Sequence, residues 1–406
     1  MTASESGANG NGVMLASVLT TVSSVYPAFL AGALGPELRS SIGLTEGFFG
    51  FVIGGFFAGS ALGSIGLGRL GERLGARRML TLSLLTTATV TALVAGLVRS
   101  GGALVVTLAL AGFANSGSQT AVNKLLSQSI DPKRLGFAMA VKQSGMPGAT
   151  LLGGLAVPAI ALTVGWPFAY GAASVLAVTA LFLVLRFAPD DGPEATVAAV
   201  KNSTPTAEVL TTQSALIAAA VAAGFSAAAA GTLGSWLTSS ATDAGWSTGA
   251  AGVLLAVGSI SGIATRLVLG WRADRTTSLP MRTAAIFLAF GALGALLLAP
   301  RVEWAHAIAA VVAFGAGWSW PALFNFAVVR ANPGAAAQAT GITQTGVYIG
   351  VFSGPIVMGQ VVERASYAVG WSLVAASMLI GATVMFAVAP KFQPAGVETA
   401  SEQLRK

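Results

Sequence analysis

Long apolar segments recur along the whole chain, and they constrain its fold more than any other feature. Hydrophobic residues make up 54% of the 406 residues and charged residues only 9%, whereas a soluble domain carries roughly 25% charged residues. A helix of about 20 apolar residues crosses a hydrocarbon core of roughly 30 Å and satisfies its own backbone hydrogen bonds there. Barrel strands would be shorter and would alternate in polarity. The sequence therefore predicts an all-α membrane protein.

The apolar segments form two sets of six. The first set is expected near 13–35, 46–67, 78–98, 103–126, 135–158 and 166–187. The second set is expected near 213–238, 248–269, 281–299, 304–328, 337–360 and 369–389. The longest polar stretch, 188–212, separates the sets and has the composition of a flexible linker. We expect an N-terminal six-helix bundle over 1–187, a linker over 188–212, and a second bundle with a tail over 213–406.

The basic residues predict the orientation in the membrane. Those that fall on the side of the linker are Arg69, Arg73, Arg77, Arg78, Lys133, Arg134, Arg272, Arg275, Arg282 and Arg330. Those on the other side are Arg39, Arg99, Arg301 and Arg364. Positively charged loops stay in the cytoplasm, so we expect a multi-pass protein of the cytoplasmic membrane with a cytoplasmic linker and both termini cytoplasmic. The net charge of +7 is scattered over short loops, which argues against a nucleic-acid partner.

Residues for catalysis or cofactor binding are scarce. The chain has no cysteine and a single histidine, His306. Without thiolates or a cluster of nucleophile, base and metal ligands, neither an enzyme nor a cofactor or metal site is expected. His306 lies near the external end of the tenth segment, where a proton relay or an ordinary packed histidine are both open.

Two charged loops about two hundred residues apart share one pattern. Residues 68–78 read Gly-Arg-Leu-Gly-Glu-Arg-Leu-Gly-Ala-Arg-Arg, and residues 270–275 read Gly-Trp-Arg-Ala-Asp-Arg. Each has a glycine, a short spacer and an acid–arginine pair at the end of an apolar run. Residues 143–145, Gln-Ser-Gly, likewise correspond to residues 344–346, Gln-Thr-Gly. These matches indicate a chain built from two related halves.

The charged loop resembles the signature motif of the major facilitator superfamily of secondary transporters, and the resemblance covers essentially the whole chain. It implies twelve transmembrane helices in two six-helix bundles that rock about a central site, and a monomer. Residues 136–145, Gly-Phe-Ala-Met-Ala-Val-Lys-Gln-Ser-Gly, look like bacterial organic-anion and cyanate-permease-like branches. Arg266 resembles the eighth-helix arginine that pairs with the substrate carboxylate in monocarboxylate and oxalate transporters. The eleventh-helix lysine of the oxalate branch has no match.

The resemblance also implies a gating role for the charged loops. The expected gating residues are Gly68, Glu72, Arg73, Arg77, Gly270, Asp274 and Arg275. By resemblance, Glu72 would reach the start of the eleventh helix and Asp274 the start of the fifth, where a helix N-terminus stabilises a carboxylate. The alternative is that these loops only fix topology through their positive charge. Both interpretations stay open.

Polar groups inside apolar segments are the candidates for a substrate site, because each costs free energy in lipid. Lys124, Lys142 and Arg266 stand out, since none has a charged counterpart in the other half. Each could instead extend its head to the membrane surface. Neutral candidates are Asn115, Gln119, Asn123, Gln143, Asn325, Gln344, Tyr26, Trp320 and Tyr348. Trp and Tyr also mark membrane interfaces, so their role is open.

The charge pattern predicts the substrate class. Glu46, Asp243, Glu303 and Glu363 fall near the external ends of segments, and no acid is predicted at mid-membrane. Cations without a buried carboxylate attract anions. We therefore expect a secondary transporter of a small organic anion, a carboxylate, working by rocking alternate access. Symport is the assumed mode, although the residues identify neither the coupling ion nor the direction. The alternative is a multidrug exporter, favoured by the aromatic candidates and weakened by the missing acid.

Overall fold

The computed structural model describes residues 3–131, 138–139, 141–190, 211–273, 280–332 and 335–392, and these are almost entirely helical, with no strand among them. Within this part of the chain, eleven helical spans are long and apolar enough to cross a membrane, and a shorter apolar helix, α13 (Pro280–Leu296), adds a twelfth. The prediction of an all-α membrane fold is confirmed.

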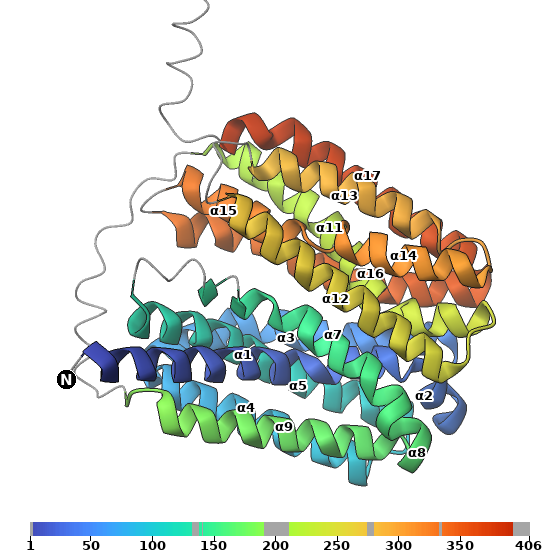
Figure 1. The fold of residues 1–406 in the computed structure, drawn as a ribbon, viewed down its shortest axis with the longest axis horizontal. Helices are drawn as coiled ribbons and strands as arrows, with labels where there is room; N and C mark the ends of the chain where they lie inside the picture. Colours follow the sequence, from blue (N-terminus) through green and yellow to red (C-terminus); the bar gives the residue numbers. More distant parts are fainter. Residues whose placement is uncertain are drawn as a thin grey trace, which may run out of the picture.

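Helices from the N-terminal part of the chain form the first bundle (Figure 1). They are α1 (Ala3–Ala33), α3 (Glu46–Leu74), α4 (Ala76–Gly96), α5 (Gly101–Ser129), α7 (Gly145–Ala156) and α9 (Trp166–Phe187). Short pieces complete it: α2 (Gly35–Ile42), a π-helical turn (Val157–Ala161) and α8 (Leu162–Val164). Helix α1 packs against α5, α7 and α9, while α5 also packs against α3 and α4.

The second bundle is built in the same way from the C-terminal part of the chain (Figure 1). Its helices are α11 (Gln213–Asp243), α12 (Thr248–Ala273), α13, α14 (Glu303–Gly315), α15 (Trp320–Ala331), α16 (Ala336–Arg364) and α17 (Tyr367–Val388), with a final turn, Ala389–Phe392. Helix α11 packs against α16 and α17, and α13 packs against α14 and α17. Two groups of helices thus follow one another along the chain, as the repeat predicted.

Helix α1 begins, α9 ends, α11 begins and α17 ends at the same end of the molecule (Figure 1). We call this the linker end and the other the opposite end. Of the expected linker, 188–212, residues 191–210 lie outside the described residues. The bundles meet through α3 and α16, α7 and α12, and α1 and α11.

Glycines allow the closest of these approaches between the bundles. A Cβ atom added to Gly154 of α7 would lie 2.4 Å from the carbonyl oxygen of Gly252 in α12. A Cβ atom added to Gly50 of α3 would lie 2.7 Å from the carbonyl oxygen of Pro355 in α16. Both contacts belong to the half of the molecule near the opposite end, where small residues let backbones pack in direct contact.

The tenth predicted helix differs from the structure. A single helix was expected over 304–328, but the chain is interrupted at residues 316–319, between α14 and α15. Pro321 lies in the first turn of α15 and has no N–H to continue a helical ladder. Gly317 packs so closely on Gly291 of α13 that a Cβ atom added to Gly291 would lie 2.2 Å from the Cα atom of Gly317. The sequence thus contained the signal for the break, a proline inside an apolar run.

Candidate functional site

Arg266 of α12 makes hydrogen bonds within its own bundle and to the first bundle. Its side chain is buried, with 7% exposed. Its Nε donates to the carbonyl oxygen of Trp318 at 3.0 Å, and its Nη2 donates to the same oxygen. Its Nη1 donates to the carbonyl oxygen of Gln143 at 3.1 Å, across to the first bundle. The guanidinium carbon also lies 5.5 Å from the centre of the Trp318 ring, a cation–π distance.

Lys142 lies beside this contact, because it precedes Gln143 in the chain. It is buried, with 4% exposed. The ion pairs among the described residues are Arg39–Glu46, Arg77–Asp190 and Arg301–Asp243. Neither Lys142 nor Arg266 pairs with an acid in that part of the chain. Two predicted cations, one in each bundle, are therefore buried, and neither has a carboxylate partner among the described residues.

Asn115 and Gln119 of α5 join a chain of side-chain hydrogen bonds inside the first bundle. Asn115 Nδ2 donates to Ser60 Oγ at 3.2 Å. Gln119 Nε2 lies 3.2 Å from Asn115 Oδ1 and 3.3 Å from Ser24 Oγ, and donates to both. The amides therefore connect α5 to α3 and α1, and a polar strip runs through the bundle at this level.

The other predicted substrate residues are placed less centrally. Lys124, Asn325, Gln344 and Tyr348 are half-buried and Asn123 is exposed, and their side chains make no hydrogen bond within the described residues. Tyr26 is buried and donates from its hydroxyl to the carbonyl oxygen of Leu152 at 3.4 Å. Trp320 is buried and its indole N–H has no partner among the described residues. The structure does not bring these residues to the Arg266 contact by any hydrogen bond.

Aromatic rings from both bundles pack edge to face in a group that includes Trp318, the neighbour of Arg266. Phe57 of α3 pairs with Phe29 of α1 at 6.4 Å between ring centres, Phe29 with Trp318 at 5.7 Å, and Trp318 with Phe314 at 5.2 Å. We call these four residues the aromatic cluster. Phe29 lies near the end of α1 and Phe57 in the first half of α3, so the cluster separates Arg266 from the opposite end. Sequence analysis missed it, because Phe in an apolar helix carries no distinguishing signal.

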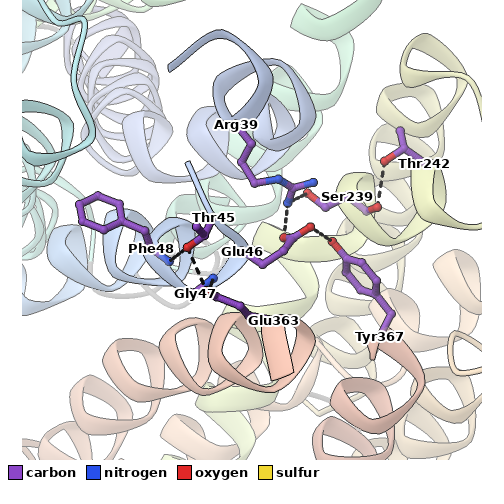
Figure 2. A network of polar contacts seen from close by, with 9 residues as sticks. All are labelled: Arg39, Thr45, Glu46, Gly47, Phe48, Ser239, Thr242, Glu363 and Tyr367. Carbon is purple, nitrogen blue, oxygen red and sulfur yellow. Dashed lines mark hydrogen bonds and ion pairs between the residues drawn. The ribbon is translucent and has the colours of Figure 1, made fainter. Parts of the chain in front are cut away.

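Polar residues from the two bundles meet at the opposite end (Figure 2). Arg39 of α2 forms an ion pair with Glu46 of α3, and its Nη1 donates to Ser239 Oγ of α11 at 3.1 Å. The Tyr367 hydroxyl of α17 donates to Glu46 Oε1 at 3.1 Å. An ion pair of the first bundle is therefore hydrogen-bonded to two helices of the second.

Glu363 of α16 makes the second part of this contact (Figure 2). Its Oε2 accepts from the backbone N–H of Gly47 at 2.6 Å and from Thr45 Oγ1 at 3.1 Å. Thr45 is the N-cap of α3 and accepts from the N–H of Phe48. A carboxylate of one bundle thus sits on a helix N-terminus of the other, where the unpaired N–H groups and the helix dipole stabilise it. We call Arg39, Thr45, Glu46, Gly47, Ser239, Glu363 and Tyr367 the opposite-end latch.

The predicted gating residues lie at the linker end, and the structure describes some of them. Arg73 is exposed, Gly270 is half-buried, and Gly68 and Glu72 fall within α3 without further description. Arg77 donates to the carbonyl oxygen of Leu185 at 2.8 Å and pairs with Asp190 at 3.6 Å, both in its own bundle. Asp274 and Arg275 lie outside the described residues. The expected contacts of Glu72 and Asp274 with helix N-termini stay predictions.

His306 is a packed histidine in the second bundle. Its side chain is 1% exposed. Nδ1 lies 3.1 Å from the carbonyl oxygen of Val302, and Nε2 lies 3.0 Å from Ser240 Oγ. Trp371 Nε1 donates to the same hydroxyl at 2.7 Å. Both ring nitrogens are therefore bonded within the second bundle, next to Ser239 of the opposite-end latch.

Comparison with solved structures supports the arrangement of the helices. Similar folds include a peptide transporter POT in complex with sulfate, at 15% identity and a TM-score of 0.73, covering 94% of this chain and 95% of that chain. A mutant peptide transporter POT with alafosfalin matches at 15% identity and a TM-score of 0.71, with 94% of each chain covered. At this identity the likeness shows the fold alone. The chain has no match among curated protein sequences.

The sequence itself settles the family. The family model described as Major Facilitator Superfamily matches residues 11–355, which include both charged loops and every helix from α1 to most of α16. The fold agrees with that match, and the two together indicate a transporter and not an enzyme. The chain belongs to the major facilitator superfamily.

Proposed function

We propose that this transporter moves a small organic anion, a carboxylate, across the cytoplasmic membrane by rocking alternate access. The observation that carries the proposal is the pair of buried cations, Arg266 and Lys142, without an acid partner among the described residues. A buried charge without compensation is costly. A substrate carboxylate would supply the missing negative charge.

The hydrogen bonds of Arg266 leave room for such a ligand. A guanidinium has five N–H groups, and the bonds to Trp318 and Gln143 use one on Nε, one on Nη2 and one on Nη1. One N–H therefore remains on each terminal nitrogen. A carboxylate has two oxygens at matching separation and is the ligand that a guanidinium binds best. Lys142 would add a second positive charge from the first bundle.

The proposed orientation follows from the basic loops, which would make the linker end cytoplasmic. The opposite-end latch would then hold the bundles together on the external side. In this interpretation the structure represents a state in which a substrate reaches Arg266 from the cytoplasm. The aromatic cluster would close the path beyond it.

Flux into proteoliposomes tests the proposal. The panel would contain acetate, lactate, oxalate, succinate, chloride, a dipeptide and a lipophilic cation, each measured with and without an imposed proton gradient to test symport. We expect carboxylate flux in the wild type and a loss of at least about tenfold in Arg266→Gln and in Lys142→Gln, since each removes a charge-assisted contact. Lys391→Gln, which removes an exposed lysine from the final turn, is the matched control.

Other outcomes would replace the proposal. Dipeptide flux without carboxylate flux would favour a peptide transporter, as the similar solved structures are. Flux of the lipophilic cation that is indifferent to Arg266 and Lys142 would make the protein a multidrug exporter. Either result contradicts an organic-anion transporter.

A further inference from the structure

The interruption between α14 and α15 places a free carbonyl group next to Arg266. In a continuous helix, the carbonyl of residue 318 accepts from the N–H of residue 322. Helix α15 begins at Trp320 with Ser319 as its N-cap, so Trp318 lies outside its hydrogen-bond ladder. The Trp318 carbonyl accepts instead from Nε and Nη2 of Arg266.

Two features of the sequence maintain this interruption. Pro321 lacks the N–H that would otherwise donate to the carbonyl of Gly317. Gly317 in turn packs directly on Gly291, and an added Cβ atom would also lie 2.5 Å from the carbonyl oxygen of Ala313. The local backbone is therefore set by residues that do not themselves touch Arg266.

The carbonyl contacts one particular edge of the guanidinium. Nε and Nη2 form the side edge, which the Trp318 carbonyl fills, and Nη1 is held by Gln143 from the other bundle. A free arginine side chain samples many rotamers. Bonds on two sides remove that freedom and fix the direction in which the unused N–H groups point.

We propose that the interruption at residues 316–319 is a positioning device for Arg266, in which Pro321 breaks the helical ladder at Gly317 and so keeps Trp318 outside α15, and the Trp318 carbonyl then orients the guanidinium toward the substrate carboxylate. This rests on the proposed function. Pro321 and Trp318 are positioning residues, because they act through Arg266 and not on the substrate. The device makes the site selective for a group that accepts two hydrogen bonds from the terminal nitrogens.

The chain provides a matched control for a test of Pro321. Helices α9 and α15 both begin with Trp-Pro, Trp166-Pro167 in the first bundle and Trp320-Pro321 in the second. The hydrogen bonds of Arg266 go to Gln143, two residues before α7, and to Trp318, in the segment before α15, and not to α9. Replacing either proline with alanine makes the same chemical change at the same helix position, and only Pro321 is linked to Arg266.

The experiment measures carboxylate flux and backbone opening in the same variants. The probe is whichever of acetate, lactate, oxalate and succinate has the lowest KM in wild-type proteoliposomes. For Pro321→Ala we expect KM to rise about tenfold with maximal flux little changed, because a hydrogen bond to a charged group is lost. Hydrogen–deuterium exchange over 314–323 should slow as the helix closes. Pro167→Ala should change neither the KM nor the exchange over 314–323. In an Arg266→Gln background, Pro321→Ala should cause no further loss of carboxylate flux.

The remaining variants test whether the carbonyl or the indole ring of Trp318 positions Arg266. Trp318→Phe keeps the carbonyl and an aromatic face, so its KM should rise less than in Pro321→Ala. Pro321→Gly also restores the N–H but has poorer helix propensity than Pro321→Ala, so its KM should rise less than the tenfold expected for Pro321→Ala. It takes the place of Pro321→Ala in the test if that variant does not fold. Slower exchange with unchanged KM, or a larger effect of Trp318→Phe, would overturn the positioning role. Absence of carboxylate flux in the wild type would instead overturn the proposed function, and this inference with it.

Discussion

The two ends of the molecule differ in how the bundles meet. At the opposite end, the latch joins α2 and α3 to α11, α16 and α17 by hydrogen bonds, and glycine contacts bring backbones together below it. Toward the linker end the ribbons of the bundles diverge (Figure 1). Among the described residues, a side-chain hydrogen bond between the bundles on that side joins Arg266 to Gln143. The bundles are therefore in close contact at the opposite end and separate toward the linker end.

The two ends are also alike in one kind of contact, a carboxylate on a helix N-terminus, observed at one end and predicted at the other. At the opposite end the structure shows a carboxylate, Glu363, on the N-terminus of α3 in the other bundle. At the linker end the sequence predicts the same kind of contact for Glu72 and Asp274. A molecule that rocks between two states can use carboxylates on helix N-termini at each end in turn. The following predictions test whether the two ends work against each other.

The largest expected effect comes from the closest backbone approach. In Gly154→Ala, the new Cβ atom lies 2.4 Å from the Gly252 carbonyl oxygen, and overpacking of this kind costs about 1–3 kcal/mol. We expect closure at the opposite end to become up to about 100-fold less favourable. Spin labels at Ser41→Cys and Ala365→Cys, both exposed positions in a chain without native cysteine, would report the separation. Gly171→Ala is the control, because nothing lies within 4 Å of its Cβ position.

Removal of the Glu363 charge should have the next largest effect. Glu363→Gln weakens the bonds to Gly47 and Thr45, and we expect about a tenfold shift toward separated labels, as for other charge-assisted bonds. Glu303→Gln removes a carboxylate from the same end that lies outside the latch, and it should leave the label distances unchanged. Equal shifts in the two variants would show that only the overall charge matters.

Asp274→Ala should move the equilibrium in the opposite direction to Glu363→Gln. If Asp274 fastens the linker end in the other state, its loss favours the state described here, by roughly three- to tenfold for a dipole contact with hydrogen bonds. Transport should fall while insertion into the membrane is retained. Unchanged transport kinetics in a well-expressed variant, together with unchanged label distances, would leave the loop with its topological role alone.

The smallest effect is expected from Tyr367→Phe. It removes one hydrogen bond, to Glu46, while the Arg39–Glu46 ion pair remains. A hydrogen bond to a charged group contributes about 1.5–3 kcal/mol, but Arg39 still pairs with Glu46 and water can replace the lost donor at this partly exposed carboxylate, so the equilibrium should shift by only a few-fold. A shift as large as that of Glu363→Gln would mean that Tyr367, and not the capping carboxylate, dominates the latch.

Apolar length predicted the helices, because each segment must satisfy its backbone and cover about 30 Å of hydrocarbon. Apolar length did not predict the break in the tenth helix, because the apolar run continues through Gly317 and Pro321. The proline was the signal for an interruption there. Helix α3 was expected to end near residue 67 but continues to Leu74, because the charged loop itself is helical there. The hydrophobicity pattern therefore predicts that a segment crosses the membrane, but it does not predict where the backbone of that segment departs from a helix.

The candidate site was predictable only in its charges. Arg266 and Lys142 were identifiable as rare cations in apolar segments, and the structure shows both buried. Their partners were not predictable, because Trp318 and Gln143 contribute backbone carbonyls, which every residue has. The latch was hidden for another reason: Glu46 and Glu363 were placed at the same end, but their pairing depends on how α3 and α16 pack across some three hundred residues of chain.

The Glu363 contact on α3 has a consequence for the speed of the transport cycle. Thr45 and Glu363 are both exposed, so water can take over the Gly47 N–H, the Thr45 hydroxyl and the carboxylate as soon as the bundles part. A contact whose groups are rehydrated while it breaks has a low free-energy barrier to opening. It also adds only a modest free-energy difference between the state in which it is made and the state in which it is broken. Such a contact favours one state by a small margin and releases it readily, which suits a machine that must return to its starting position at every turnover.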